Sequence, residues 1–242
     1  MAALGMKAPD DMALSCEMHV LPSRAELATT LAATIAGRLS DAIAKRGTGF
    51  IAVSGGSTPA LLFAELSKER IDWTKVIVTL IDERLVPPDQ PRSNARLVAD
   101  KLLQGPASAA TFIPLYHGTD DGEEAARRAR AELAGLPWPL DVAILGMGPD
   151  GHTASFFPDA SNVAELLAAD ADLLVLPVES ATAHEHRLTL TLGRIVEAGF
   201  LALHIEGPDK KEVLDRVLAG ENLPVGAAIE ASPRPVQIFW AE

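Results

Sequence analysis

The sequence predicts an α/β protein of three layers, in which a mainly parallel sheet is flanked by helices on both faces. Short apolar runs alternate with amphipathic segments of ten or more residues, the pattern of parallel strands joined by helical crossovers. Hydrophobic residues make up 48% of the 242 residues, which suffices for a large core. Because neither a repeat nor a low-complexity linker interrupts the pattern, we expect a single domain over residues 1–242.

The first predicted helix is the longest. Ser23 and Glu26 have the spacing of a capping box, which satisfies free N–H groups at a helix start. Gly47 is typical of a helix end. Between them, apolar residues recur at helical spacing and predict one buried face: Leu27, Leu31, Ile35, Leu39 and Ile43.

The remaining elements alternate along the chain. We expect strands at residues 48–53, 76–81, 112–114, 142–145, 173–178, 200–205 and 236–240. We expect helices at residues 59–68, 93–103, 121–134 and 209–218, with loops at 105–110 and 137–139. The alternating run from Arg187 predicts a further strand that carries Arg187, Thr189 and Thr191 on one face.

Composition restricts the class of protein. The formal net charge of −12 argues against nucleic acid and anionic membranes as partners. No apolar run approaches the about 18 residues that span a bilayer, and Asp10 and Asp11 interrupt the start of the chain, where a secretory signal is apolar. Cys16, the only cysteine, excludes an intrachain disulfide and agrees with a reducing compartment. We expect a cytoplasmic monomer or small homo-oligomer.

Polar clusters follow four of the predicted strands, at residues 54–59, 82–84, 146–153 and 207–210. Parallel sheets bind ligands beyond the carboxyl ends of their strands. In the first cluster, Gly55 and Gly56 let the backbone approach a ligand, and Ser57 and Thr58 add hydroxyl donors. The segment suits a phosphate, although an ordinary turn with Ser57 or Thr58 as N-cap remains open. It lacks the lysine of a nucleotide P-loop.

The cluster at 146–153 holds a histidine in a glycine-rich loop. Its glycines have the spacing of a dinucleotide fingerprint, but Pro158 follows too soon for the long helix of that motif, which argues against a nicotinamide cofactor. An imidazole such as His152 can accept a proton from water near neutral pH, with Asp150 to orient it. The alternative is a histidine that only satisfies the loop backbone.

Three basic residues are candidates to bind anions. Arg84 could stabilise developing negative charge, with Asp82 or Glu83 to orient it; the alternative is a surface ion-pair turn. Arg187 and Lys210 are candidates to bind a phosphate. Lys210 stands out because a lysine in the first turn of a helix is unfavourable unless an anion lies there. Either residue could instead be a solvated charge. His184 and His186 lack a third ligand at a recognisable spacing, so we expect no metal.

Taken together, these segments resemble the 6-phosphogluconolactonases. The resemblance spans about residues 50–218, and the run 150–158 is its most specific part. The family is similar in fold to glucosamine-6-phosphate deaminases, but this chain lacks their Phe-Asn-Glu stretch after His152 and has Arg84 where they place an aromatic residue. Phe156 replaces the family's more usual leucine. The matching segments are residues 54–59, 82–84, 93–94, 145–155, 187–189 and 207–210.

The resemblance implies hydrolysis of 6-phospho-D-glucono-1,5-lactone to 6-phosphogluconate in the oxidative pentose phosphate pathway. It implies His152 as general base, Asp150 as its partner, Arg84 as the group that stabilises the oxyanion, and Asp82 beside it. Neither a cofactor nor a covalent nucleophile is implied. The implied phosphate-binding residues are Ser54, Gly55, Gly56, Ser57, Thr58, Arg187 and Lys210.

Two other classes share such a phosphate site. A glucosamine-6-phosphate deaminase or another sugar-phosphate isomerase would use it with a base beside C1 and C2 of an open-chain sugar. A sugar-phosphate sensor would dispense with His152 and carry a DNA-binding helix pair, for which this acidic chain has no spare segment.

Overall fold

The computed structural model describes residues 14–168, 173–183 and 185–242. Within them, seven strands form one sheet in which every neighbouring pair is parallel. The predicted parallel sheet is therefore confirmed. In spatial order the strands are β1 (Cys16–Val20), β10 (Val236–Ala241), β9 (Phe200–Glu206), β6 (Val142–Leu145), β2 (Gly49–Val53), β3 (Val76–Leu80) and β5 (Thr111–Ile113).

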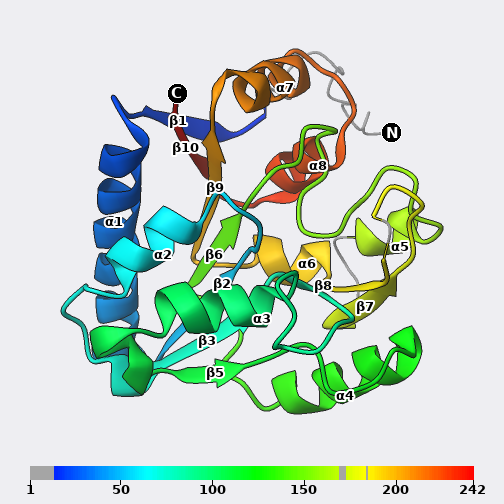
Figure 1. Cartoon of the computed structure of the whole chain (residues 1–242). Coiled ribbons are helices and arrows are strands. Elements are labelled where there is room, and N and C mark those ends of the chain that lie inside the picture. The colour runs from blue at the N-terminus through cyan, green and yellow to red at the C-terminus, as the bar shows by residue number, and fades with distance from the viewer. Residues whose placement is uncertain (1–13, 169–172, 184) are drawn as a thin grey trace, which may run out of the picture.

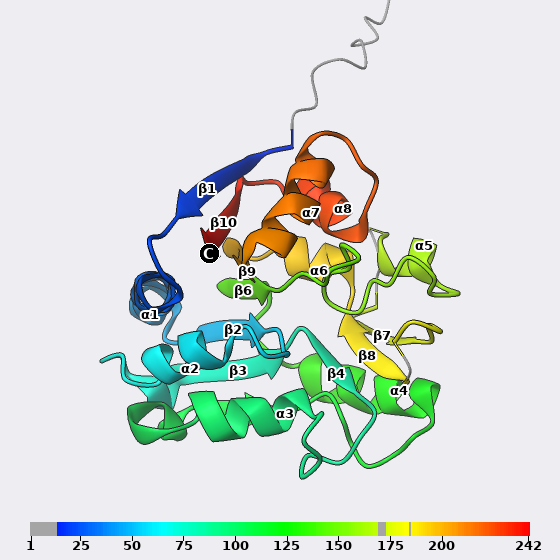
Figure 2. The same ribbon diagram turned by 45° about the horizontal axis from the view of Figure 1, so that its top comes forward.

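Helices cover both faces of this sheet, as predicted. On one face lie α1 (Arg24–Arg46) and α2 (Ala60–Leu66), and on the other lie α6 (Leu192–Val196) and α8 (Pro224–Ala231) (Figures 1 and 2). The other helices are α3 (Asn94–Leu97), α4 (Gly122–Leu133), α5 (Val163–Leu166) and α7 (Pro208–Leu218). α3 continues as a π-helical segment (Val98–Leu102), and single 3-10 turns cover Trp73–Lys75 and Gly105–Ala109.

The local signals for α1 have the predicted effect. The Ser23 hydroxyl accepts a hydrogen bond from the backbone N–H of Glu26 at 3.2 Å. Gly47 ends the helix in the left-handed conformation, with φ of 83°, and donates its N–H to the carbonyl of Ile43. Leu27, Leu31, Ile35 and Leu39 are fully buried against the sheet, and each contributes about 1.5–3 kcal/mol by leaving water.

A second, antiparallel sheet was not anticipated. It consists of β4 (Asp82–Arg84), β8 (Arg187–Leu190) and β7 (Val175–Val178). The strands expected at 173–178 and from Arg187 therefore lie outside the parallel sheet. Ile81 joins the two sheets, because its N–H donates to Val53 of β2 and its carbonyl accepts from Leu190 of β8. The acidic and basic residues of β4 thus continue directly from a strand of the main sheet.

Other elements differ from the prediction in detail. β1, an edge strand of mixed polarity, was not predicted, and neither were the short helices α5, α6 and α8. None of the helices in the described part of the chain is long and apolar enough to cross a membrane. Asp10 and Asp11, which entered the prediction about secretion, lie outside the described residues.

The order of the strands creates a crevice between β2 and β6. After β2 the chain proceeds to β3 on one side of the sheet, whereas after β6 the next strand of the same sheet is β9, on the other side. Ligands of open α/β sheets bind at such a reversal. The predicted clusters at 54–59 and 146–153 leave the sheet at this point, side by side.

Candidate active site

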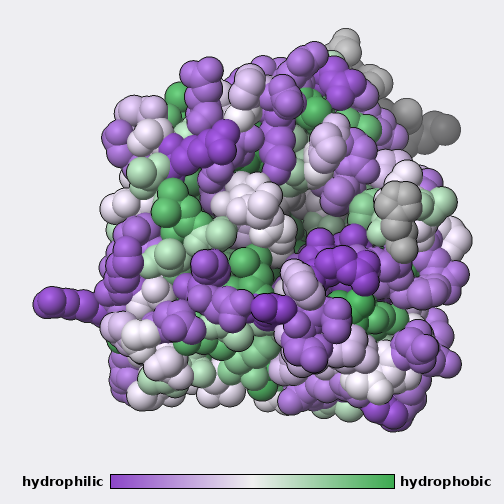
Figure 3. Space-filling view, in the orientation of Figure 1, coloured by the Kyte–Doolittle hydropathy of each residue, from purple (hydrophilic) through white to green (hydrophobic). Residues whose placement is uncertain are grey.

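One cavity lies at this crevice and has a volume of about 200 Å³. Figure 3 shows that this face of the molecule is hollowed near its centre, with hydrophilic side chains along the rim. The cavity brings together all but one of the predicted site residues, and the exception, Asp150, lies behind His152. The predicted residues that line it are Ser54, Gly55, Gly56, Ser57, Thr58, Asp82, Arg84, His152, Arg187 and Lys210.

Ser54 ties the two loops of the crevice together. Its hydroxyl donates to the carbonyl of Ile144 at 2.9 Å and accepts from the N–H of Gly146 at 3.2 Å. The side chain is buried, so its predicted contact with phosphate competes with a structural role. The glycine turn, residues 54–58, is therefore held in register with the loop after β6.

The glycine turn leads into α2, a helix of only seven residues whose N-cap is Pro59. Neither Ser57 nor Thr58 is the N-cap, so their hydroxyls are not used in capping. Gly56 has φ of 93°, a conformation that other residues rarely adopt. Thr58 Oγ1 accepts a hydrogen bond from Lys210 Nζ at 3.1 Å, which joins the turn to the first turn of α7.

Lys210 lies at the start of a helix, as predicted. It is more than half-buried, and this burial lowers the pKa of its ammonium group, an effect that Glu206 opposes. A lysine in that position gains from an anion in the cavity, because the anion restores the stabilisation that water no longer supplies.

Arg84 and Arg187 are directly opposite each other on β4 and β8. Like charges in this arrangement repel. Burial lowers the pKa of Arg187, and Arg84 acts in the same direction, whereas Asp82 opposes it. Among the described residues, Nε of each arginine is buried without a hydrogen-bond partner. Both arginines line the cavity, so together they can bind an anion there.

The two carboxylates of the Asp-Glu-Arg cluster have different surroundings. Asp82 accepts a hydrogen bond from Ser155 Oγ at 2.7 Å and lies 3.7 Å from Arg187, so it orients Arg187. Glu83 is fully buried and binds the start of α3 instead. Burial raises the pKa of Glu83, and hydrogen bonds from four donors oppose that effect.

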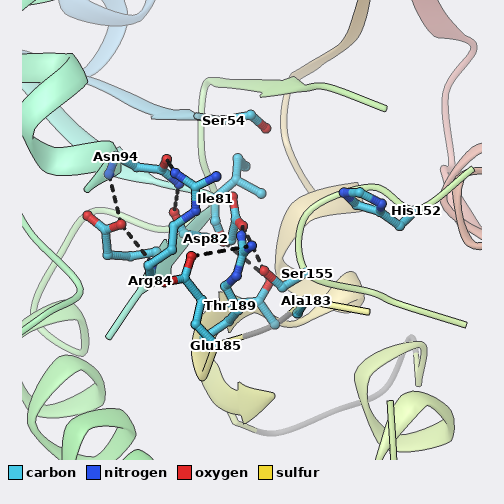
Figure 4. A network of polar contacts seen from close by, with 12 residues as sticks. Ser54, Ile81, Asp82, Arg84, Asn94, His152, Ser155, Ala183, Glu185 and Thr189 are labelled. Atoms are coloured by element: carbon cyan, nitrogen blue, oxygen red, sulfur yellow. Dashed lines mark hydrogen bonds and ion pairs between the residues drawn. The ribbon is translucent and has the colours of Figure 1, made fainter. Parts of the chain in front are cut away.

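His152 faces these cations from the other side of the cavity (Figure 4). Its Nδ1 lies 2.5 Å from Asp150 Oδ1, which leaves Nε2 for a substrate or water. The imidazole also packs on the ring of Phe157, with centroids 4.5 Å apart. The guanidinium of Arg187 lies over the Phe157 ring as well, 5.5 Å from its centroid. The loop closes through the N–H of Gly148, which donates to the carbonyl of His152 at 2.9 Å.

Gly148 leaves the space that this histidine needs. A Cβ at Gly148 would lie 2.2 Å from His152 Cε1 and 2.6 Å from Asp150 Oδ1. The glycine that suggested a dinucleotide fingerprint thus serves a different purpose: it admits the imidazole and carboxylate pair.

No role was predicted for two polar residues that line the cavity, Asn94 and His204. Asn94 bonds to Arg84, and a signal for it was its place in the segment 93–94, which matches the 6-phosphogluconolactonases. His204 is buried on β9, and its Nε2 lies 3.1 Å from Glu206. Its place near the carboxyl end of a predicted strand could have indicated that it reaches the site.

The residues considered as a metal pair are only partly described. His184 lies outside the described residues, and His186 lies 3.5 Å from Glu179 at the surface. Within the described ranges, no three His, Cys, Asp or Glu side chains are arranged to hold a metal ion.

Comparison with known proteins gives a consistent result. Residues 22–240 match the model of the family described as glucosamine-6-phosphate isomerases/6-phosphogluconolactonase. A 6-phosphogluconolactonase of Mesorhizobium japonicum is 57% identical, covering 94% of this chain and 96% of that protein, and one of Rhizobium meliloti is 47% identical, covering 94% and 100%. The crystal structure of a 6-phosphogluconolactonase from Shewanella baltica is similar, with a TM-score of 0.91 and 36% identity over 96% of this chain and 100% of that one.

Proposed function

This chain belongs to the family of glucosamine-6-phosphate isomerases and 6-phosphogluconolactonases, and we propose that it hydrolyses 6-phospho-D-glucono-1,5-lactone to 6-phosphogluconate in the oxidative pentose phosphate pathway. One observation carries the proposal: an imidazole held by a carboxylate shares a cavity with three cationic side chains. The imidazole suits the activation of water, and the cations suit a substrate with a phosphate that gains negative charge during reaction.

His152 is the general base in this proposal. Asp150 holds Nδ1, so Nε2 takes a proton from a water molecule as the water oxygen attacks the lactone carbonyl. Such help contributes about 10²–10⁴ in rate. A six-membered ring ester is reactive enough that the attack requires no covalent nucleophile.

Arg84 stabilises the tetrahedral oxyanion that forms next. One of its terminal nitrogens is held by Asn94 and by the carbonyl of Arg92, and the residue lines the cavity. The bond to the ring oxygen then breaks, and this oxygen takes the proton from His152. The products are a carboxylic acid, which ionises, and a free hydroxyl. Removing one preorganised donor from such a site costs about 10²–10³ in kcat.

The phosphate lies against the glycine turn in this proposal. Lys210 and Thr58, already in contact, supply a charge and a hydroxyl, and Ser57 with Gly55 and Gly56 supply further donors. Arg187 adds a second positive charge, oriented by Asp82. The chain's own groups account for every step, so we propose no cofactor and no metal. The single cysteine supports the cytoplasmic location that we propose, and we propose a monomer or small homo-oligomer.

The test is base consumption at constant pH on freshly prepared 6-phospho-D-glucono-1,5-lactone. We expect the wild type to accelerate hydrolysis well above the spontaneous rate and His152→Ala to lose about 10²–10⁴ of that acceleration. His117→Ala is a matched control, because His117 lies outside the cavity near Glu132. Equal rates for wild type and His152→Ala would contradict the proposed mechanism.

The rival function within the family is isomerisation with deamination. Release of ammonia from glucosamine 6-phosphate, measured on the same preparation, distinguishes the two activities. We expect none above background, because the sequence around His152 and at Arg84 differs from the deaminase pattern.

A further inference from the structure

Asn94 lies at the point where the glycine turn, Arg84 and β4 meet. Only 2% of its surface is exposed. Its Oδ1 accepts a hydrogen bond from a terminal nitrogen of Arg84 at 2.8 Å, and its Nδ2 donates to the backbone carbonyl of Asp82 at 2.7 Å. The donor on one side and the acceptor on the other fix the orientation of the amide (Figure 4).

The glycine turn touches the same amide. A Cβ at Gly55 would lie 1.8 Å from Asn94 Oδ1 and 2.5 Å from Asn94 Nδ2. Only a residue without a side chain allows the backbone of the turn to come this close. Asn94 therefore spaces the backbone that is proposed to hold the phosphate from the guanidinium that is proposed to act on the carbonyl.

The carboxylate of Glu83 holds the backbone of Asn94 in place. Its Oε1 accepts the backbone N–H of Asn94 at 2.8 Å, and its Oε2 accepts the N–H of Ala95 at 2.8 Å and the hydroxyl of Ser93 at 3.0 Å. The backbone at the start of α3 is thus anchored to β4, the strand that also carries Arg84. Hydrogen bonds therefore hold both the backbone of Asn94 and the amide group at the end of its side chain.

An amide holds Arg84 here where a carboxylate would be the commoner partner of an arginine. A carboxylate would satisfy the guanidinium and reduce the positive charge that it offers to a substrate. It would also face the carbonyl of Asp82 with no hydrogen to donate. The neutral amide orients the cation and leaves its charge uncompensated.

We propose that Asn94 is a positioning residue for the lactone hydrolysis: its amide sets the place of the Arg84 guanidinium relative to the glycine turn and preserves its charge. This inference rests on the proposed function, because it takes Arg84 to act on the reacting carbonyl or on the carboxylate that forms from it. Because the amide bonds to Arg84, we expect the effect of Asn94 to pass through that arginine.

A double-mutant cycle with Arg84 tests this inference. We expect Asn94→Ala to lower kcat about tenfold, the size of a lost hydrogen bond to a charged group. In the Arg84→Ala background, the same change should lower kcat by less than twofold, because the group that Asn94 positions is already absent. Equal losses in both backgrounds would show that Asn94 acts independently of Arg84, and would overturn the proposal.

A binding experiment gives a readout that does not depend on turnover. We expect Asn94→Ala and Arg84→Ala each to weaken 6-phosphogluconate binding about tenfold by calorimetry, because this ligand carries a carboxylate, while inorganic phosphate binding changes by less than twofold. Equal weakening of both ligands would place the role of Asn94 at the glycine turn and overturn the proposal. If the wild type binds 6-phosphogluconate but does not hydrolyse the lactone, the proposed function fails and the binding comparison still decides the role of Asn94.

Two further variants guard against misfolding. Asn94→Asp keeps the size of the side chain, and we expect it to weaken 6-phosphogluconate binding at least tenfold, because it compensates the charge of Arg84. Binding by Asn94→Asp equal to that of the wild type would overturn the claim that the charge must stay free. The matched control is Asn162→Ala, which removes an amide that donates to the carbonyl of Pro177 away from the cavity. We expect that variant to bind as the wild type does.

Discussion

Asp150 affects the site only through His152. It does not line the cavity, and its Oδ1 lies against Nδ1 of the imidazole. Because a carboxylate can only accept at this position, it keeps the proton on Nδ1 and leaves Nε2 as the base. The identity of this residue therefore sets which nitrogen of His152 can take a proton from water.

We expect Asp150→Asn to lower kcat by about 10²-fold or more, because an amide that turns its NH₂ group toward Nδ1 stabilises the opposite tautomer. The measurement is kcat and KM for the phosphorylated lactone. Asp159→Asn is a matched control: Asp159 accepts hydrogen bonds from Ser180 and Thr182 outside the cavity. A kcat for Asp150→Asn within twofold of the wild type would contradict the assignment.

Lys210 should make phosphate binding depend on pH. Burial lowers the pKa of its ammonium group, so the free protein begins to lose this charge at a pH below the usual lysine value. The neutral amine cannot attract the phosphate dianion, so affinity should fall as pH rises through that lowered pKa. We expect the calorimetric Kd of inorganic phosphate to increase between pH 8 and pH 10 for the wild type.

Lys210→Arg tests the sign of this effect. Arginine keeps its charge throughout this range, so we expect the variant to bind phosphate with an affinity that changes little with pH. The control is Lys211→Arg, which replaces a surface lysine paired with Asp215 at 2.6 Å and should retain the pH dependence of the wild type. A pH dependence that persists in Lys210→Arg would assign the titration to another group.

At the scale of elements, the loop after β6 has a shape that depends on one small residue. Gly148→Ala places a methyl group where His152 Cε1 lies. We expect the imidazole to move and kcat to fall at least tenfold. The affinity for inorganic phosphate should change by less than twofold, because the glycine turn, residues 54–58, belongs to a different loop. The measurements are lactone hydrolysis and calorimetry with phosphate.

Gly135→Ala is the matched control for that change, because Gly135 is exposed and a Cβ there meets no atom within 4 Å. Both variants should fold, since neither glycine has a positive φ. Full activity of Gly148→Ala would show that the loop can shift without moving His152.

Some elements of this fold can be predicted from the sequence and others cannot. The signals for α1 are local, a cap at Ser23 and a glycine at 47, so the prediction was right. The site clusters could be predicted because parallel strands direct their carboxyl ends to one edge. β4 could not be predicted, because a three-residue Asp-Glu-Arg strand has no apolar pattern, and its partner strand begins 103 positions after Arg84, at Arg187.

The individual roles within the site were also beyond sequence reasoning. Asp82 and Glu83 are adjacent carboxylates, yet one faces Arg187 and the other lies under α3. Alternation along β4 separates them, and no pattern in the chain specifies which of them faces the cavity. His204 stands in an apolar run that predicts a buried strand, so its approach to the cavity depends on the packing of β9.

At the scale of the whole molecule, the formal net charge of −12 and the cationic cavity coexist. The three cationic side chains come from separate elements: Arg84 from β4, Arg187 from β8 and Lys210 from α7. The three residues lie far apart in the sequence, which is why composition alone predicts no anion site. The local positive charge is a product of the fold, and it should disappear when either sheet comes apart.

We therefore expect the two sheets and the cavity to unfold together, as one domain over residues 1–242 implies. Phe50 is fully buried on β2 and packs edge-on against Trp138, with centroids 5.1 Å apart. Phe50→Ala should lower the free energy of unfolding by about 3–5 kcal/mol. If the chain is one cooperative unit, denaturant curves followed by far-UV circular dichroism, by the combined fluorescence of its three tryptophans and by activity should coincide, and Phe50→Ala should move all three midpoints equally. The exposed Leu218, changed to Ala, should move none of them by more than a small amount. Loss of activity well before the change in tryptophan fluorescence would show instead that the antiparallel sheet, which carries Arg84 and Arg187, opens as a separate unit.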